Sequence, residues 1–396
     1  MARQRTILSS SLAAIVLVTA ACGSDDDSGG AAGDDGTTTA AAAVTTATSA
    51  ASGVSDVDPA LPFPADRCAA NQEAGTITYL SSFDYAASAS IVEVIVAEQK
   101  GYFDALCLDV EMAASFSTAN YPLISANEAQ FSSGGSFSEV LDFGAKNEAD
   151  LVVLAVEGHT AIDGLITKDG EIESLADVRG ATIGVKGKIS TSVAAMLAAE
   201  GLVEGTDYET VLIDGFDPKV HIELPGIIGF PGYKSNEPGQ LERAGIPFQL
   251  WDPSERDIPG SFGILYTNKQ FLDAHPTAAM DFMRAAMLGL KDALADPQTA
   301  ADMAIELING NGNPNFLSPE GEVFRWKTEA EIIKATTAPG QPYGFPDPVS
   351  LQAEVDAYAA IGLFGGDTAP SIDGVANPLV GDVYADDDRT VIWPAQ

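Results

Sequence analysis

Apolar positions along the chain follow two spacings, which predict strands and helices in turn. TITYLSSF, residues 76–83, has the composition of a strand, and a polar turn follows it. IVEVIVAEQKGYFDAL then repeats apolar residues at near-helical spacing, and Gly101 is suited to end that helix. Further along lie a strand, a short helix and an apolar run, at residues 108–115, 121–129 and 150–158. The order strand, helix, strand, helix, strand predicts a parallel sheet with helices on its faces.

The same alternation resumes in a second unit that begins near residue 174. A helical turn leads into the strand ATIGV, and KISTSVAAMLAAEGL reads as a helix that Gly201 ends. Apolar, strand-like segments follow, and a long helix starts at Pro276. Helical segments continue to about residue 365, and no repeat of fixed period is visible. A chain of 396 residues with this order suits two lobes rather than one core.

The N-terminal residues depart from this pattern. Two arginines precede an apolar run with the length of a signal-peptide core, so residues 1–21 are predicted to be an export signal. The run ends at TAAC, which resembles the lipobox of bacterial lipoproteins, in which the cysteine, here Cys22, becomes the lipidated N-terminus. A secretory signal without lipid is the alternative. Residues 22–72 begin with Gly, Ser, Asp, Ala and Thr and are predicted to be a flexible membrane tether.

Cysteines, charge and histidines narrow the possible chemistry. If Cys22 carries lipid, Cys68 and Cys107 remain, and we predict a disulfide between them, with two free thiols as the alternative. The formal net charge of −37 disfavours nucleic acid and anionic lipid as partners. No two of the three histidines have metal-ligand spacing, so no metal site is predicted. GVKGK is not a phosphate loop, because Ile189 follows Lys188 where Ser or Thr is required.

Four motifs carry a resemblance to a known family. They are IVAEQKGYFDALCLDVEM, SLADVRGATIGV, YKSNEPGQLERAGI and KQFLDAHPTAAMDFMRAAMLGL, and the similarity covers most of residues 75–365. Their order and spacing resemble bacterial substrate-binding proteins of the nitrate, sulfonate and taurine class, whose relatives include binders of thiamine-pyrimidine precursors and of riboflavin. One departure is that Leu106 and Cys107 stand where a glycine turn is common.

The resemblance implies an α/β type II periplasmic-binding-protein fold, with two lobes, two crossover hinge strands and a ligand cleft between the lobes. Lobe 1 would comprise residues 75–169 plus 261–365, lobe 2 would comprise 170–260, and 366–396 would form a C-terminal tail. It further implies a monomeric, extracytoplasmic receptor without cofactor, anchored by lipid to the bacterial cell membrane. Such a receptor would deliver a small molecule to an ABC permease and its ATPase. An enzyme of pyrimidine synthesis on the same fold is disfavoured, because the chain has no cysteine cluster.

Ligands of open α/β sheets bind beyond the carboxyl ends of the strands, so strand exits supply the candidate site. An aromatic pair around an acid is suited to stacking on a flat ring, a glycine pair lets backbone amides approach a ligand, and hydroxyls at a helix start can hold a polar group. A histidine after the apolar run is a further candidate. These candidates are Phe83, Asp84, Tyr85, Gly134, Gly135, Ser136, His159, Ser190, Thr191 and Ser192.

The fourth exit, YKSNEP, contains Tyr233, Asn236 and Glu237. A carboxylate can accept two parallel hydrogen bonds from an amino group and an adjacent ring N–H, so Glu237 is predicted to recognise an aminopyrimidine edge while Asn236 orients it. The NEP pattern resembles the vitamin-precursor binders more than the anion binders. A surface turn that caps the next helix is the other interpretation of Glu237.

The ligand class stays open between an aromatic vitamin-type molecule and a small oxyanion such as taurine, an alkanesulfonate or nitrate. An oxyanion cleft favours an arginine or several converging donors. Lys186, Lys188 and Lys234 are candidates, but no arginine falls at a predicted strand exit. The sequence therefore favours a neutral or weakly basic aromatic ligand.

Overall fold

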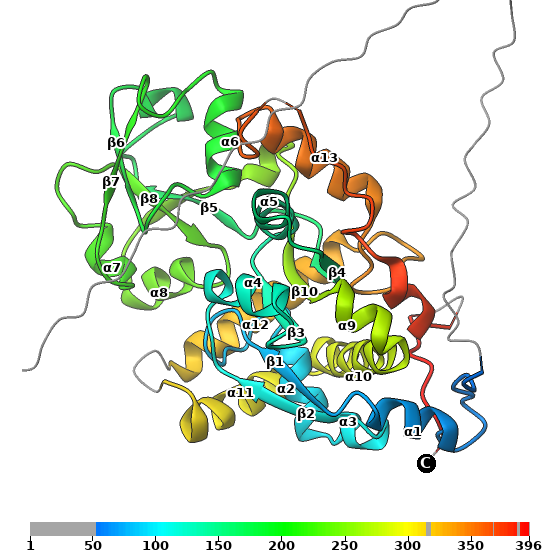
Figure 1. Cartoon of the computed structure of the whole chain (residues 1–396). Coiled ribbons are helices and arrows are strands. Elements are labelled where there is room, and N and C mark those ends of the chain that lie inside the picture. The colour runs from blue at the N-terminus through cyan, green and yellow to red at the C-terminus, as the bar shows by residue number, and fades with distance from the viewer. Residues whose placement is uncertain (1–52, 314–317, 367, 386–388, 396) are drawn as a thin grey trace, which may run out of the picture. The chain divides into compact units, whose positions relative to one another are not determined.

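The computed structural model describes residues 53–313, 318–366, 368–385 and 389–395. The predicted export signal, Cys22 and the first part of the predicted tether lie outside these residues. The described chain contains two five-stranded sheets with helices packed on them (Figure 1). Its helices are too short or too polar to cross a membrane.

The first sheet has the strand order β2-β1-β3-β10-β4. Its strands are β1 (Thr76–Leu80), β2 (Asp109–Ala113), β3 (Phe131–Gly134), β4 (Leu151–Gly158) and β10 (Phe262–Asn268). Every residue of β3, β4 and β10 is buried, as expected for apolar strands with both faces covered. Strands β1, β2 and β3 are parallel, whereas β10 is antiparallel to both of its neighbours.

The second sheet has the order β7-β6-β8-β5-β9. Its strands are β5 (Asp163–Lys168), β6 (Thr182–Val185), β7 (Glu209–Leu212), β8 (Gly229–Tyr233) and β9 (Phe248–Trp251). Here β5 is the strand that runs antiparallel to its neighbours. The chain enters this sheet at Asp163, ahead of the boundary at 170 expected from the sequence.

The two antiparallel strands are the crossovers between the sheets, since β5 follows β4 and β10 follows β9. The parallel strands of each sheet point toward the other sheet. A strand that has just crossed over points away from the sheet that the chain has left, so it is antiparallel to its new neighbours. The parallel arrangement predicted for the first strands is found in β1, β2 and β3, and the crossover strands β5 and β10 add antiparallel neighbours to the two sheets. The crossing segments touch, since a Cβ atom on Gly260 would lie 2.6 Å from the main-chain nitrogen of Ala161.

Helices cover the faces of the sheets. Prolines begin α10 to α13, and the side chains of Asp296, Ser318 and Asp347 cap α11, α12 and α13. The helices are α1 (Ala65–Gln72), α2 (Val92–Gln99), α3 (Tyr102–Ala105), α4 (Ser117–Ser125), α5 (Phe137–Asn147), α6 (Thr191–Ala199), α7 (Pro218–His221), α8 (Glu237–Ala244), α9 (Lys269–Ala274), α10 (Pro276–Ala295), α11 (Pro297–Asn311), α12 (Pro319–Thr336) and α13 (Pro348–Ala359). Short 3-10 turns are η1 (Leu175–Val178), η2 (Pro253–Arg256) and η4 (Pro378–Val383).

Helix α1 departs from the expected tether, which was taken to extend to residue 72. The Arg67 guanidinium forms a buried ion pair with Asp281 of α10, with 2.7 Å between Nε and Oδ2. Cys68 and Cys107 form a disulfide, with their Cα atoms 5.2 Å apart. Cys107 has φ of 57°, the left-handed conformation that a glycine turn would supply. Long-range contacts, which composition does not reveal, therefore bind this helix to the first sheet's helices.

The C-terminal tail packs against the same helices. Val380, Val383 and Tyr384 are buried in the core that contains α10. Arg284 of α10 donates to the main-chain oxygen of Ile392, and the Ala395 N–H donates to the Leu61 carbonyl at 2.8 Å. The two ends of the described chain therefore lie next to each other.

Candidate functional site

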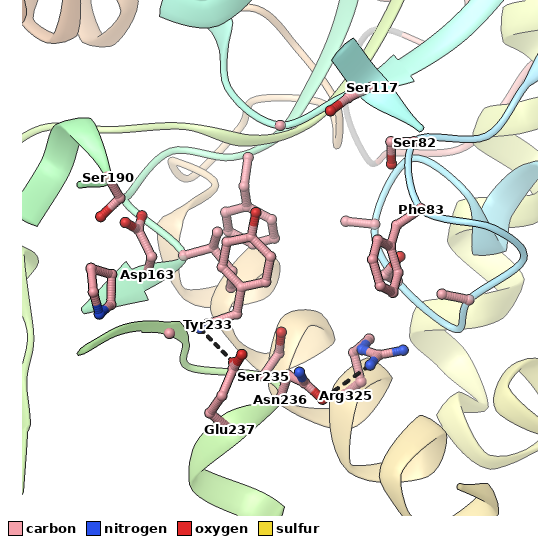
Figure 2. Close-up of a pocket in the computed structure, with 18 of the residues that line it drawn as sticks. Ser82, Phe83, Ser117, Asp163, Ser190, Tyr233, Ser235, Asn236, Glu237 and Arg325 are labelled. Atoms are coloured by element: carbon pink, nitrogen blue, oxygen red, sulfur yellow. Dashed lines mark hydrogen bonds between the residues drawn. The ribbon is translucent and has the colours of Figure 1, made fainter. Parts of the chain in front are cut away.

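A cavity of about 570 Å³ lies between the two sheets (Figure 2). Its lining comes from segments that follow β1, β2, β3, β6, β7 and β8, and from the first residues of the crossover strands β5 and β10. Helix α12 adds Arg325 and Glu329. The cavity thus lies at the carboxyl ends of the parallel strands of both sheets, where ligands of open α/β sheets bind.

Aromatic side chains form much of its wall. Phe83, Phe116, Phe216 and Tyr233 are 38%, 50%, 55% and 54% exposed, and all four line the cavity. Across the residues that the structure describes, no other aromatic side chain is this exposed. Phe83 meets Phe116 and Phe216 edge to face, with ring centroids 5.7 and 6.5 Å apart. Figure 2 shows Phe83 and Tyr233 on opposite sides of the cavity.

Glu237 lines the cavity as the first residue of α8 and is only 4% exposed. Its Oε2 accepts from the Tyr233 N–H at 2.8 Å, and its Oε1 accepts from the Lys186 ammonium at 3.3 Å. Glu237 is therefore neither a solvated turn residue nor an unbound carboxylate. Each of its oxygens has one partner, and a carboxylate oxygen can accept a second hydrogen bond.

Helix α12 brings a second carboxylate to the cavity. Oε1 of Glu329 accepts from the Ser235 hydroxyl and its Oε2 from the Ala89 N–H, both at 2.6 Å. Burial raises the pKa of Glu329 to about 7, while the bonds from Ser235 and the Ala89 N–H act in the opposite direction. Glu329 thus joins segments that follow β1 and β8, one from each sheet.

Arg325, one turn before Glu329, makes a similar connection. Its Nη1 pairs with Oε1 of Glu322 at 2.6 Å, and its Nη2 donates to Oδ1 of Asn236 at 3.0 Å. Asn236 is therefore held both from α12 and from its own helix, since Oδ1 also accepts from the Gln240 side chain of α8 at 3.0 Å.

Asp163 and Ser190 face each other at the side of the cavity away from Phe83 (Figure 2). Burial raises the pKa of the Asp163 carboxyl, and the nearby Ser190 and Ser192 hydroxyls act on the pKa in the opposite direction. Asp163 begins the crossover strand β5. An acid therefore stands beside the first turn of α6.

The structure brings together part of the predicted set. Six predicted residues line the cavity: Phe83, Gly135, Ser190, Tyr233, Asn236 and Glu237. Of the three lysine candidates, Lys186 and Lys188 line it as well, whereas Lys234 pairs with Asp252.

The remaining predicted residues lie outside the lining, and several of them have structural partners. Asp84 accepts from the Asn313 N–H, and the Tyr85 hydroxyl donates to the Met112 carbonyl. His159 lies 3.2 Å from the Ser350 hydroxyl. Gly134 lies within β3, Ser136 caps α5, and Thr191 and Ser192 form the first turn of α6.

Sequence reasoning missed several lining residues. Phe116 follows the predicted strand 108–115 and Phe216 follows β7, so the strand-exit rule would have found them if applied to every strand. Arg325 and Glu329 had no local signal, because they approach from a helix rather than from a strand exit. The described residues hold no cluster of His, Cys, Asp and Glu that could bind a metal ion.

The chain is similar in sequence to a known protein family and to a known binding protein. A family model described as "NMT1/THI5 like" matches residues 88–300, more than half of the 396-residue chain. The riboflavin-binding protein RibY of Chloroflexus aurantiacus is 30% identical over 139 residues, which are 35% of this chain and 39% of that relative. This match therefore spans well under half of the relative's length.

Solved structures are similar in fold at low identity. The ligand-binding component of an ABC-type import system from Staphylococcus aureus has a TM-score of 0.56 at 12% identity, covering 80% of this chain and 99% of that one. The alkanesulfonate-binding protein SsuA of Xanthomonas axonopodis pv. citri, bound to MOPS, has a TM-score of 0.52 at 12% identity, covering 76% and 96%. Together with the two mixed sheets, these similarities show the two-lobed α/β type II periplasmic-binding-protein fold.

Proposed function

Because the chain belongs to the NMT1/THI5-like family, we propose that it is an extracytoplasmic substrate-binding protein of an ABC importer. It captures a small aromatic ligand of vitamin type, such as a thiamine pyrimidine precursor or a flavin, in the cavity between its sheets. It acts as a monomer, is held to the bacterial cell membrane by lipid on Cys22, and passes its ligand to a permease. The proposal assigns the chain no reaction, since transport energy comes from the partner ATPase.

The observation that best supports an aromatic ligand is that exposed aromatic side chains gather at the cavity. Phe83, Phe116, Phe216 and Tyr233 are the most exposed aromatic side chains of the described chain, and all four line the cavity. A soluble protein gains nothing by leaving such rings uncovered unless they meet another surface. A planar ring between Phe83 and Tyr233 would cover apolar area on both of its faces.

The carboxylates of the cavity supply acceptors for the edge of that ring. Glu237 retains acceptor capacity beyond its bonds to the Tyr233 N–H and Lys186. Asp163, which the sequence did not indicate, adds a second acidic side chain to the same side of the cavity. Amino and ring N–H groups of a pyrimidine or flavin fit such acceptors. The partial similarity to RibY, named as riboflavin-binding, agrees with this ligand class.

A small oxyanion is the second candidate, favoured by the cationic side chains Lys186, Lys188 and Arg325 at the cavity. The similar fold of SsuA, named as alkanesulfonate-binding, supports the same class. Against it, Lys186 and Arg325 already pair with Glu237 and Glu322. We therefore rank the aromatic ligand first.

A thermal-shift screen of the protein without residues 1–22 tests the proposal. The ligands are hydroxymethylpyrimidine and related aminopyrimidines, thiamine, riboflavin, taurine, alkanesulfonates and nitrate. A ligand at 100 times its dissociation constant is expected to stabilise the folded state by about 2.7 kcal/mol. Glu237→Gln should weaken an aminopyrimidine or flavin by roughly tenfold, the effect of one charge-assisted hydrogen bond.

Glu320→Gln is the matched control, because Glu320 is an exposed acid at the start of α12 and does not line the cavity. If only sulfonates or nitrate stabilise the protein, and Glu237→Gln leaves that stabilisation unchanged, the ligand of the cavity is an oxyanion. Failure of every small molecule to stabilise the protein would contradict a binding function.

A further inference from the structure

The main-chain donors that precede α2 are already bound to carboxylates of the protein itself. Three N–H groups in the segment after β1 donate to three glutamates that are at most 5% exposed. The pairs are Ala87 to Glu322 at 2.7 Å, Ala89 to Glu329 at 2.6 Å and Ser90 to Glu157 at 3.2 Å. Such donors at the start of a helix are otherwise a ready site for an oxyanion.

Other helices that start near the cavity also have an acid at their first turn. The Ser138 N–H in α5 donates to the buried Glu354 at 3.1 Å. Asp163 stands beside Ser190 at the start of α6, as Figure 2 shows. Helix α8 begins with Glu237 itself. The donors before α2 and at the start of α5 are therefore bound to carboxylates, while α6 and α8 have an acid beside or within the first turn.

Two of the three cationic side chains at the cavity form ion pairs with carboxylates. Arg325 pairs with Glu322 at 2.6 Å, and Lys186 pairs with Glu237 at 3.3 Å. Lys188 interacts electrostatically with Glu139, an acid in the first turn of α5. An incoming anion would have to displace these carboxylates, and the displaced groups would remain close to it.

We propose that the cavity selects against anions: it accepts the uncharged or cationic form of an aromatic ligand and rejects the phosphate ester of the same ring. The inference rests on the proposed function for the aromatic part of the ligand, but the exclusion of anions follows from the carboxylates alone. A phosphate ester adds between one and two negative charges at neutral pH. The donors described above are either bound to a carboxylate or, like the unpaired Ser190 and Ser192 hydroxyls beside Asp163, would bring the added charge close to one.

The first experiment needs no knowledge of the ligand. Melting of wild type, Glu329→Ala and the exposed control Glu320→Ala is compared in inorganic phosphate and in chloride at equal ionic strength, on the alkaline side of the Glu329 pKa of about 7. Wild type and control should show no phosphate-specific shift. Glu329→Ala should gain one, because the Ala89 N–H and the Ser235 hydroxyl lose their acceptor and can bind the ion.

Phosphate-specific stabilisation of wild type would overturn the inference, and so would a Glu329→Ala variant that responds no more than the control. If Glu329→Ala does not fold, Glu329→Gln replaces it. This variant retains the shape of the side chain and removes its charge. Its phosphate-specific stabilisation should exceed that of Glu320→Gln, but by less than Glu329→Ala would exceed Glu320→Ala.

The second experiment uses ligand pairs that differ only in a phosphate, riboflavin with its 5′-phosphate and thiamine with its monophosphate. Wild type should bind the parent compound at least about tenfold more tightly than the ester, as one uncompensated charge at partly screened distance implies. Glu329→Gln should narrow that ratio, and Glu320→Gln should not. Equal or tighter binding of an ester by wild type would overturn the inference and leave the binding function intact. If neither member of any pair binds, the result counts against the aromatic ligand. The melting comparison in phosphate and chloride then still tests the selection against anions.

Discussion

The two lobes share one strand topology but differ in how much holds them together. In each sheet the order is second, first, third, crossover and fourth strand. In the first lobe, β3, β4 and β10 are buried at every position, and the disulfide and the Arg67–Asp281 pair add to a large core. In the second lobe, β7 is largely exposed and β9 is mostly half-buried. One topology thus supports a strongly packed lobe and a lightly packed one, and the cavity lies between them.

The buried ion cluster of the first lobe should give the largest effect. Asp281→Asn leaves Arg67 and Arg284, 4% and 3% exposed, without their carboxylate and should cost about 3 to 5 kcal/mol of unfolding free energy. The matched change in the second lobe, Asp252→Asn, weakens a pair with 10% and 17% exposure and should cost about 1 kcal/mol. Urea denaturation of both variants measures the difference. Equal losses of unfolding free energy would show that ion pairs stabilise the two lobes to the same extent.

Removal of the disulfide should come next. Cys68 and Cys107 are 39 residues apart in sequence, so a Cys68→Ala, Cys107→Ala double variant should lose roughly 3 to 4 kcal/mol. The effect belongs to the first lobe, because Cys68 lies in α1 and Cys107 lies just before β2 of the first sheet. Denaturant midpoints of the variant and of wild type provide the measurement. An unchanged midpoint would mean that α1 is held by packing alone.

The pH dependence of stability should also come from the first lobe. Burial raises the pKa of Glu93 from 4.5 to about 8, and the pKa of the neighbouring Glu157 carboxyl is raised as well. The folded state therefore binds more protons than the unfolded state between these values, and stability should fall as the pH rises from about 4.5 to 8. Glu93→Gln should remove about 2 kcal/mol of this fall. Thermal melts across the pH range measure this dependence of stability on pH. If stability changes with pH in the variant as it does in wild type, groups other than Glu93 cause the effect.

The smallest effect is expected at the edge of the second sheet. Leu212 of β7 is 70% exposed, so Leu212→Ala should change the unfolding free energy by less than about 0.5 kcal/mol. The buried Leu154 of β4 provides the contrast, since a cavity left by Leu154→Ala costs about 2 to 5 kcal/mol. A comparable loss at both positions would mean that β7 is covered in solution by a surface that the isolated chain does not show.

Local pattern predicted most elements and the position of the cavity, because strand and helix periods are local and strand exits follow from them. Phe83, Ser190 and Glu237 were found in this way. The direction of β5 and β10 was not, since periodicity identifies a strand without saying which sheet it enters or which way it runs. Glu329 was not found either, because a helix that follows the crossover brings it to the residues after β1 and β8. Helix α1 escaped notice because its partner Asp281 is distant in sequence.

The closeness of the two chain ends has a mechanical consequence. Any pull applied through the N-terminus reaches the fold first at Ser55, which is bonded to Asp66 and Arg67, then at Leu61, where the Ala395 N–H is bound, and then at Cys68. From there the disulfide transfers tension directly to Cys107, so β1 and α2 lie within a covalent loop that bears no load. The segment that carries Phe83 into the cavity is part of that loop. A pull on the N-terminal side of the disulfide would therefore leave this wall of the cavity in place.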